Sequence, residues 1–343
     1  MKKLITAGLV MFMMAGVSSS YGASESVIKL KVADVFPITH PVSVTGIKPW
    51  MEKVTALTNG KVQFDYFPAE QLGKAKDTLK LLQGKLAHVS FVGPSYVVST
   101  MPLSGVMEIP GAVSSSVAGV NTFWKLTQTL LLKPDYLDNG IVPIFVYSLP
   151  PYEIYTTTKA VKTFADMKGL KLRTTGGAND QAIKDLGATP VSMPIQEMYE
   201  AIDKRVVDGT IMSAISVKPY KVQELVKYAT QGANLGTYVG TYCVNLDVWK
   251  SLPANVQKAM VQAGEETSME LAKVLDKQAA DFTAEFVAGG MQIYKLTPAE
   301  QTAWAQKMSS VEAEWLAKLK NRSALGVQLI QERNRLTKEF AEK

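Results

Sequence analysis

The chain has few of the side chains that metal sites and covalent catalysis use. Its 343 residues include one cysteine, Cys243, and two histidines, His40 and His88. A structural zinc site takes about four Cys or His ligands, so we expect no metal site. Cys243 has no second cysteine for an intramolecular disulfide, and on an apolar strand we interpret it as packing.

The sequence also lacks the common catalytic motifs. It contains no HExxH, P-loop or GxGxxG pattern, and "FVGPSYV" is not the GxSxG nucleophile elbow. Paired acids such as Glu265 and Glu266 fall on a predicted helix surface, where contact with solvent is the default. We therefore predict no catalytic residues and no cofactor.

The longest apolar run, from Leu4 to Val17, is too short for a stable membrane span, which needs about 20 residues. It follows a basic head, Lys2 and Lys3, and precedes small residues, a pattern typical of a secretory signal peptide. No cysteine that could carry a lipid anchor lies near the predicted cleavage site. We predict a cleavable signal peptide over residues 1–22 and a soluble periplasmic protein.

No basic stripe with interleaved aromatic residues, the pattern of nucleic-acid binding, is present. Lysine and arginine number 37 against 31 acids, for a formal net charge of +6, and the lysines are scattered among the acids. The nearest approach to a stripe comprises Lys159, Lys162, Lys168, Lys171 and Arg173. We interpret its lysines as a solvated face and predict no nucleic-acid partner.

The length and the apolar periodicity predict two α/β lobes. Removing 22 residues from 343 leaves 321, whereas a single core stops growing at about 250–300 residues. Residues 28–92 alternate between strand and helix periods, and a buried strand follows at 142–149. A second such series begins after Pro150-Pro151. Helical crossovers between strands imply parallel pairing.

Three later segments complete the predicted architecture. "GTYVGTYCVNLDVW" is long enough to lead back to the first lobe, and "VKPYKVQELVKYA" has helical spacing. A helical pattern of roughly 35 residues, about 50 Å long, starts at Pro253, so we expect it to cross both lobes. The fold class is α/β, a two-lobed periplasmic binding protein fold (type II-like) with a cleft between the lobes. The predicted boundaries are 23–150 plus 238–278 for lobe I and 151–237 plus 279–343 for lobe II.

The C-terminal region has two helical signals. Thr297 and Glu300 have capping-box spacing, with proline at the first helical position. The stripe that follows, which we interpret as core, is Trp304, Met308, Val311, Trp315 and Leu319. The last segment, "GVQLIQERNRLTKEF", has apolar spacing compatible with docking on its own lobe or with pairing to another chain. We favour a monomer.

The stretch "GLKLRTTGG" places an arginine where ligands bind in sheets of this kind. Leu170 and Leu172 share one face of the predicted strand, so Arg173 lies on the other, last before small residues. Ligands collect beyond the carboxyl ends of such strands, and the start of the next helix favours an anion. Guanidinium matches a carboxylate through two parallel hydrogen bonds. We predict a carboxylate clamp, with a structural ion pair or a surface position as the alternative.

Three ordered motifs, "KTFADMKGLKLRTTGG", "LGATPVSMPIQEMYEAIDKRVVDG" and "VNLDVWKSLPANVQKAM", resemble the solute-binding proteins of tripartite ATP-independent periplasmic (TRAP) transporters. "FPAEQLG" is similar to the same family, and the likeness runs from about residue 28 to 320. It implies a receptor that closes on an organic acid and delivers it to two membrane permease subunits driven by an ion gradient. Arg173 matches the family's carboxylate-binding arginine.

Two departures from the family pattern concern the ligand. Glu153 stands where many members have a second arginine, and Ile211, Met212 and Ser213 stand where many have Glu-Asn-Pro. A second ligand carboxylate beside Glu153 would be repelled, so we predict a monocarboxylate with an apolar or aromatic body. Met212 is its predicted adaptable wall, with Ser213 beside it. Glu153 alternatively receives a ligand hydroxyl or amine, or faces solvent.

Further candidates for the pocket come from predicted strand ends. They are Phe91, Tyr147, Tyr238 and, in the loop "FPITHP", His40. Each has packing or loop structure as its alternative role. Two other functions stay open from the sequence: a sensory protein that docks on a receptor, and a periplasmic enzyme that uses the same cleft.

Overall fold

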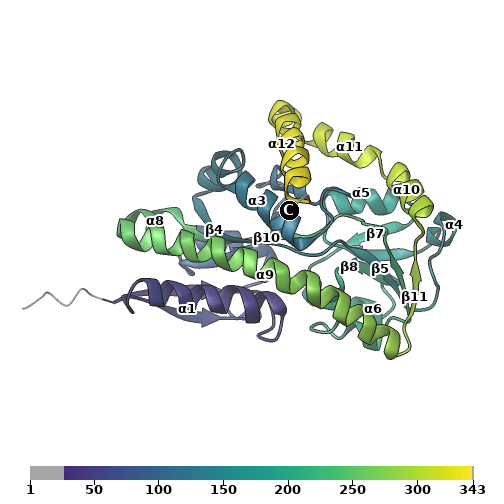
Figure 1. Cartoon of the computed structure of the whole chain (residues 1–343), viewed down its shortest axis with the longest axis horizontal. Helices are drawn as coiled ribbons and strands as arrows, with labels where there is room; N and C mark the ends of the chain where they lie inside the picture. The colour runs from purple at the N-terminus through teal and green to yellow at the C-terminus, as the bar shows by residue number, and fades with distance from the viewer. Residues whose placement is uncertain (1–26, 342–343) are drawn as a thin grey trace, which may run out of the picture.

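The computed structural model describes residues 27–341 of the chain. The predicted signal peptide, residues 1–22, lies outside this part. The described chain forms two α/β lobes that lie side by side along the long axis of the molecule, each built on one β-sheet (Figure 1). The two-lobed α/β fold predicted from the strand and helix patterns is confirmed.

The first sheet has the strand order β2-β1-β3-β10-β4. Its strands are β1 (Ile28–Ala33), β2 (Val62–Phe67), β3 (Val89–Val92), β4 (Ile141–Ser148) and β10 (Val239–Asn245). β1 pairs in parallel with β2 and β3, as crossovers through helices require. β10 is antiparallel to both of its neighbours, β3 and β4, and is the strand that returns from the second lobe.

The second sheet has the strand order β11-β9-β5-β8-β6-β7. Its strands are β5 (Glu153–Thr156), β6 (Lys171–Thr174), β7 (Thr189–Ser192), β8 (Gly209–Met212), β9 (Tyr228–Gln231) and β11 (Gln292–Lys295). β6 lies between β7 and β8 and is parallel to both. The carboxyl ends of these three strands therefore meet at one edge, where ligands collect in sheets of this type.

One segment differs from its prediction. "VKPYKVQELVKYA" forms no continuous helix: α7 (Ala214–Val217) ends at its first residue, a turn η7 (Val222–Glu224) follows, and β9 begins at Tyr228. Pro219 lacks the N–H that a helix interior needs, and Lys221 has a left-handed backbone with a φ of 57°. The predicted helix is therefore wrong, because its apolar spacing runs across two breaks and into a strand.

The remaining helices cover the two sheets. They are α1 (Lys48–Leu57), α2 (Thr78–Gln83), α3 (Ser116–Thr127), α4 (Phe164–Met167), α5 (Ala178–Asp185), α6 (Ile195–Asp203), α8 (Leu246–Ser251), α9 (Ala254–Ala288), α10 (Pro298–Lys307), α11 (Ser310–Lys318) and α12 (Ser323–Ala341). Short turns of 3-10 or π type are η1 (Val42–Ile47), η2 (Ala75–Asp77), η3 (Pro94–Tyr96), η4 (Ser104–Met107), η5 (Leu132–Tyr136), η6 (Leu137–Asn139) and η8 (Lys320–Arg322).

The long helix α9 links the lobes. It has 35 residues, beginning after Pro253 and ending before Gly289, as the apolar pattern predicts. It contacts α1, α3 and β4 in the first lobe and α7 in the second, and it runs across both lobes (Figure 1). The predicted helix across both lobes is confirmed.

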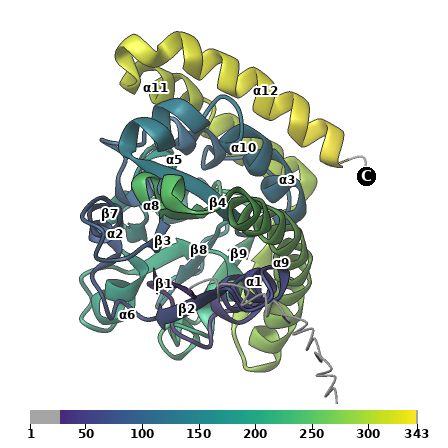
Figure 2. The ribbon, with the colours of Figure 1, turned by 90° about the vertical axis from the view of Figure 1, so that its left-hand side faces the viewer.

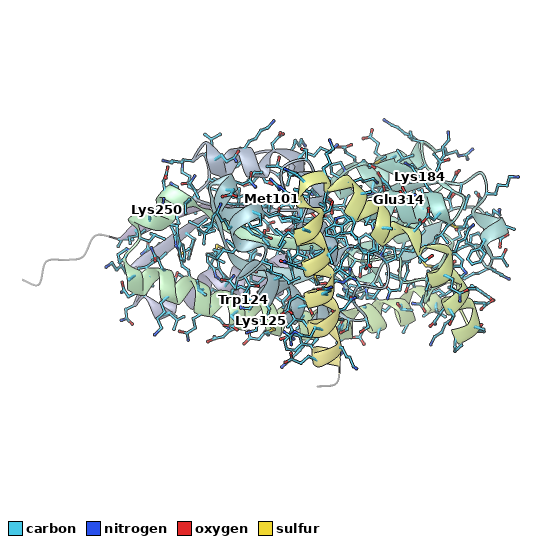
Figure 3. The ribbon with its side chains drawn as sticks, turned by 90° about the horizontal axis from the view of Figure 1, so that it is seen from above. Met101, Trp124, Lys125, Lys184, Lys250 and Glu314 are labelled. Carbon is cyan, nitrogen blue, oxygen red and sulfur yellow. The ribbon has the colours of Figure 1, made fainter. Side chains whose placement is uncertain are left out.

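The C-terminal helix α12 packs against α3. It lies beside α11 at the top of the view in Figure 2, and from above it crosses the molecule between the end marked by Lys250 and the end marked by Lys184 (Figure 3). This segment therefore docks on its own chain. α12 falls in the range predicted for lobe II and α3 in the range predicted for lobe I; the lobe boundaries and the monomeric state stay predictions.

The stripe that follows Thr297 is core, as predicted. Thr297 and Glu300 form the capping box that begins α10. The stripe residues are all buried: Trp304, Met308, Val311, Trp315 and Leu319. Trp304 lies in α10 and Val311 and Trp315 in α11, whereas Met308 and Leu319 are the residues that cap the ends of these two helices. Within residues 27–341, no helix has an apolar stretch of the length that a membrane crossing requires.

Candidate ligand-binding site

A narrow cavity lies between the lobes at the carboxyl end of β6. The first lobe contributes Val35, Phe36, Phe91, Tyr96, Leu149 and Tyr238 to its lining. The second lobe contributes Tyr152, Arg173, Thr175, Ile195, Gln196 and Ser216. The volume of the cavity is about 10 Å³, room for a single water molecule. An organic acid enters only if the lining moves apart.

Arg173 lies in this cavity, on the strand face opposite the core residue Leu172. Its side chain is fully buried, at 0% exposure. Nε and Nη2 both donate to the carbonyl oxygen of Met193, at 2.9 and 2.7 Å. Nη1 makes no hydrogen bond to any described residue, and no ion pair joins Arg173 to a described carboxylate. A buried charge without a counter-ion is unfavourable, so this guanidinium lacks an anion.

The Met193 carbonyl decides which edge of the guanidinium is free. The carbonyl accepts hydrogen bonds from Nε–H and from one N–H of Nη2, so Nη1 and the other N–H of Nη2 remain available to a ligand. Two such parallel N–H groups match the two oxygens of a carboxylate. The N-terminus of α5, predicted to help, opens instead onto a separate surface pocket lined by Gly177 and Ala178.

Aromatic side chains supply five of the twelve residues that line the cavity. Phe36 meets Phe91 edge-on at 5.5 Å between centroids, and Tyr96 lies 5.5 Å from Tyr238. Of the predicted wall residues, Phe91 and Tyr238 line the cavity, whereas Tyr147 lies behind them, stacked 6.3 Å from Tyr238. The cavity therefore has an apolar wall beside the Arg173 guanidinium.

Gly93 makes room for one of these rings. A Cβ atom at this position would lie 1.9 Å from the hydroxyl oxygen of Tyr238, a distance that no side chain tolerates. Tyr238 therefore occupies its place in the wall only because residue 93 has no side chain.

His40 lies one layer behind the lining. Its ring stacks on Phe36 at 4.4 Å, Nδ1 accepts from the Val42 N–H at 3.2 Å, and Nε2 lies 3.2 Å from Ser216 Oγ. Burial lowers the pKa of His40 to about 3, so the ring is neutral. Because Nδ1 accepts, the single ring proton is on Nε2, which donates to Ser216.

Asp34 holds the loop that carries Phe36. Its carboxylate accepts hydrogen bonds from the backbone of Val35 and Phe36 at 2.7 and 3.2 Å, and from the hydroxyls of Tyr66 and Tyr242 at 2.6 and 2.8 Å. Burial raises the pKa of Asp34, and these hydrogen bonds act against the rise. The carboxylate fixes the backbone of one wall of the cavity.

The structure does not bring Glu153, Met212 and Ser213 to the cavity. Glu153 lies opposite Met212 across the β5 and β8 pair, and its carboxylate accepts from Gly232 N and Ala233 N at 3.0 and 3.1 Å. Burial raises its pKa to about 8. Glu153 and Ser213 line a different surface pocket, and Met212 is buried in the core of the second lobe.

Several cavity residues were not predicted from the sequence. Gln196 is the second residue of α6, just beyond the carboxyl end of β7, so the strand-end rule identifies its region. Tyr96, Tyr152 and Ser216 likewise lie four residues beyond the ends of β3, β4 and β8, so the same rule identifies their regions but not the individual side chains. Within residues 27–341, no group of three or more His, Cys, Asp or Glu side chains is arranged to hold a metal ion.

The chain has two α/β lobes that are joined by crossing segments and by one long helix, and both lobes line the cavity between them. This arrangement defines the class of two-lobed solute-binding proteins. Residues 33–319 match the family of bacterial extracellular solute-binding proteins, family 7 (DctP). The chain belongs to this family, and it is a TRAP-type solute-binding protein, as the sequence motifs predict. Members of the family are receptors for solutes rather than enzymes, and they work with a membrane permease.

Known relatives cover most of the chain. The C4-dicarboxylate-binding periplasmic protein DctP of Rhodobacter capsulatus is 27% identical over 285 residues, 78% of this chain and 81% of the relative. The ectoine/5-hydroxyectoine-binding periplasmic protein UehA of Ruegeria pomeroyi is 24% identical over 272 residues, 77% and 78% of the two chains. A TRAP solute-binding protein of Rhodoferax ferrireducens, in complex with copurified benzoate, is 25% identical with a TM-score of 0.86, over 92% of this chain and 99% of that one.

Proposed function

We propose that this protein binds a small monocarboxylate with an apolar or aromatic body, and that Arg173 holds the ligand carboxylate. The observation that carries the proposal is the guanidinium itself: it is buried, anchored on one edge by Met193, and without an anion among the described residues. A ligand carboxylate supplies the missing charge and uses the free edge of the fork.

The lining supports the rest of the ligand's chemistry. Arg173 is the one charged side chain among the described residues that line the cavity, so a second ligand carboxylate would be buried without a cation, which is costly. The aromatic rings of Phe36, Phe91 and Tyr238 favour a flat apolar body. The benzoate found with the Rhodoferax relative has this composition. Glu153, Met212 and Ser213 are no part of the proposal, because they lie outside the cavity.

The role in the cell follows from the family. We propose that the chain acts in the periplasm as a monomer after removal of the signal peptide, and that it delivers its acid to the TRAP permease subunits. Loss of uptake of the acid on deletion of the protein, with the permease intact, tests this role. Unchanged uptake together with a lost transcriptional or chemotactic response would favour a sensory receptor instead.

The experiment that tests the ligand assignment is calorimetric titration of the wild type and of Arg173→Ala with benzoate and with succinate. Removing one partner of a buried charged pair costs about 3–5 kcal/mol, so we expect benzoate affinity to fall by about 100-fold or more. Succinate should bind the wild type more weakly than benzoate.

The matched control is Arg335→Ala, which removes the same charge from an exposed site on α12. It should bind benzoate as the wild type does. Benzoate affinity in Arg173→Ala equal to that of the control would contradict the clamp.

A further inference from the structure

Besides Arg173, the lining has three polar side chains with unused hydrogen-bonding capacity: Tyr238, whose hydroxyl has no partner among the described residues, Gln196 and Ser216. Of these, Gln196 and Ser216 are held by hydrogen bonds that cross from one lobe to the other, Gln196 by the Val35 carbonyl and Ser216 by His40. These bonds determine which atom of each side chain remains for a ligand.

Ser216 is left with a donor. The Val42 N–H occupies Nδ1 of His40, so Nε2 carries the ring proton and donates it to Ser216 Oγ. Ser216 Oγ is therefore an acceptor toward His40, and its own O–H has no described acceptor. The side chain is buried and lines the cavity, so this O–H is available to a ligand atom there.

Gln196 is left with an acceptor. Its Nε2 donates to the carbonyl oxygen of Val35 at 3.1 Å, which fixes the orientation of the amide. Oε1 is buried and has no hydrogen-bond partner among the described residues. Buried polar atoms in folded proteins normally have a hydrogen-bond partner. Oε1 is therefore available to accept a hydrogen bond from a ligand.

We propose that Ser216 and Gln196 form a subsite for a hydroxyl group of the ligand, so that the preferred ligand is a hydroxylated aromatic monocarboxylate. The Ser216 O–H donates to the ligand hydroxyl oxygen, and the ligand O–H donates to Gln196 Oε1. This inference rests on the proposed function, because it assumes that Arg173 holds the carboxylate.

Other substituents fit the pair less well. A carbonyl oxygen satisfies Ser216 and leaves Gln196 Oε1 without a donor. An ammonium group satisfies Gln196 and leaves the Ser216 proton without an acceptor. A second carboxylate accepts from Ser216 and is repelled by the amide oxygen. A hydroxyl group both donates and accepts, and matches both atoms.

The subsite also depends on the lobes being together. Gln196 and Ser216 belong to the second lobe, whereas Val35 and His40 belong to the first. When the lobes separate, both side chains lose the bonds that orient them. A ligand hydroxyl therefore completes the polar contacts only in the closed arrangement, which makes it a determinant of specificity rather than of first encounter.

The test is calorimetric titration of the wild-type protein with benzoate, 3-hydroxybenzoate, 4-hydroxybenzoate and mandelate. We expect at least one hydroxylated acid to bind about tenfold more tightly than benzoate, the gain typical of a satisfied buried pair of hydrogen bonds. Ser216→Ala, which loses the donor, should reduce that preference to near one. Gln196→Met, of similar length, should do the same through loss of the acceptor.

Ser99→Ala is the matched control, since Ser99 is exposed and lies outside the cavity; it should keep the full preference. Equal binding of all four acids by the wild type would overturn the subsite and leave the carboxylate clamp standing. Full preference in both Ser216→Ala and Gln196→Met would also overturn it. If the wild type binds none of the acids, the clamp and the subsite are both wrong.

Discussion

Arg173 and Arg333 are both buried, at 0% and 4% exposure, but their guanidinium groups have different surroundings. Arg333, on α12, pairs with Glu312 at 2.8 Å and donates to the Val106 carbonyl at 2.9 Å. Arg173 has the Met193 carbonyl and the nearby hydroxyl of Tyr96, but no carboxylate among the described residues. The charge of Arg333 is balanced within the chain, so its role is structural. The charge of Arg173 is not, so its partner comes from outside.

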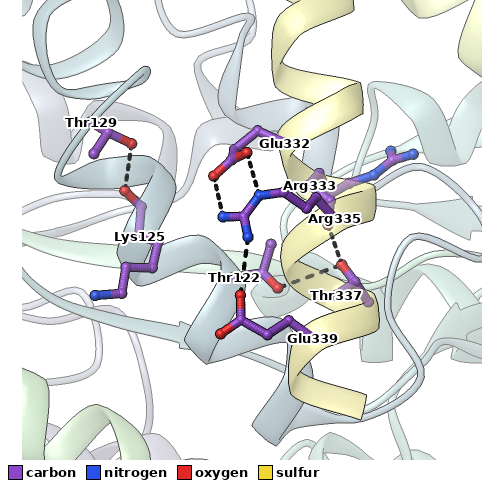
Figure 4. Close-up of polar contacts among 8 residues, drawn as sticks. All are labelled: Thr122, Lys125, Thr129, Glu332, Arg333, Arg335, Thr337 and Glu339. Atoms are coloured by element: carbon purple, nitrogen blue, oxygen red, sulfur yellow. Dashed lines mark hydrogen bonds and ion pairs between the residues drawn. The ribbon is translucent and has the colours of Figure 1, made fainter. Parts of the chain in front are cut away.

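The region around Arg333 shows what a structural polar contact looks like in this protein. On the exposed side of α12, Arg335 pairs with Glu332 and Glu339, and Thr337 lies 3.5 Å from Thr122 on α3 (Figure 4). Every one of these groups has a partner on the same or a neighbouring helix. Burial alone therefore does not identify a ligand site; a buried charge that has no counter-ion and lines a cavity does.

The largest effect should come from removing each buried arginine in turn and measuring unfolding in urea. Arg333→Ala should lower the free energy of unfolding by about 3 kcal/mol, toward the low end for a broken buried pair because Glu312 is 40% exposed and can be hydrated. Arg173→Ala should leave stability unchanged or raised, because it removes an unbalanced charge. Equal destabilisation by both would make Arg173 a structural residue and break the comparison.

Gly93→Ala sharpens the comparison at the cavity wall. The added Cβ meets the hydroxyl of Tyr238, so we expect a loss of about 1–3 kcal/mol of stability from overpacking, with weaker binding of benzoate. Gly60→Ala is the contrasting control, since nothing lies within 4 Å of a Cβ there; its left-handed φ of 80° costs stability without touching the cavity. Equal benzoate affinity in the two variants would show that Tyr238 is not part of the wall.

Buried acids behave differently from Arg173, because they can become neutral. Burial raises the pKa of Glu108 to about 8 from an ordinary value of 4.5. Between these values the folded chain holds one more proton than the unfolded chain, so stability falls as pH rises from about 4.5 to about 8. Glu108→Gln should flatten this decline in urea midpoints measured at pH 5 and pH 8.5. A decline as steep as that of the wild type would contradict the assignment.

We expect the smallest change in the free energy of unfolding when the hydroxyl group of one of two buried tyrosines, Tyr242 or Tyr147, is removed. Tyr242 donates to Asp34 at 2.8 Å, so Tyr242→Phe should cost about 1–2 kcal/mol of unfolding free energy. The hydroxyl of Tyr147 has no partner among the described residues, so Tyr147→Phe should cost nothing. A larger loss for Tyr147→Phe than for Tyr242→Phe would show that the Tyr147 hydroxyl is satisfied in solution.

The sequence predicts the elements that rest on local periodicity and end signals. α9 follows from a sustained helical spacing between Pro253 and Gly289, and Arg173 is placed in the cavity by strand alternation and the strand-end rule. β9 begins inside a segment with helical apolar spacing, and its parallel partner β11 lies 64 positions further along the chain (292 minus 228). Their pairing depends on neighbours far along the chain.

The polar contacts of the site cannot be predicted from the sequence, because they also join residues that are far apart along the chain. The contact between His40 and Ser216 joins residues 176 positions apart, and no local pattern records it. Glu153 illustrates a second limit. Tyr152, in the segment before β5, lines the cavity, whereas Glu153, the first residue of β5, accepts hydrogen bonds from the backbone of Gly232 and Ala233 and lines another pocket. Assigning Glu153 to a family position therefore does not place its side chain in the cavity.

The most direct test of the account is a crystal structure of the protein with 4-bromobenzoate, in which anomalous scattering from bromine fixes the orientation of the ligand. We expect the carboxylate oxygens about 2.7–2.9 Å from Nη1 and Nη2 of Arg173, with the ring between Phe36, Phe91 and Tyr238. A ligand whose bromine occupies the place of the carboxylate, or whose carboxylate pairs with another cation, would contradict the account.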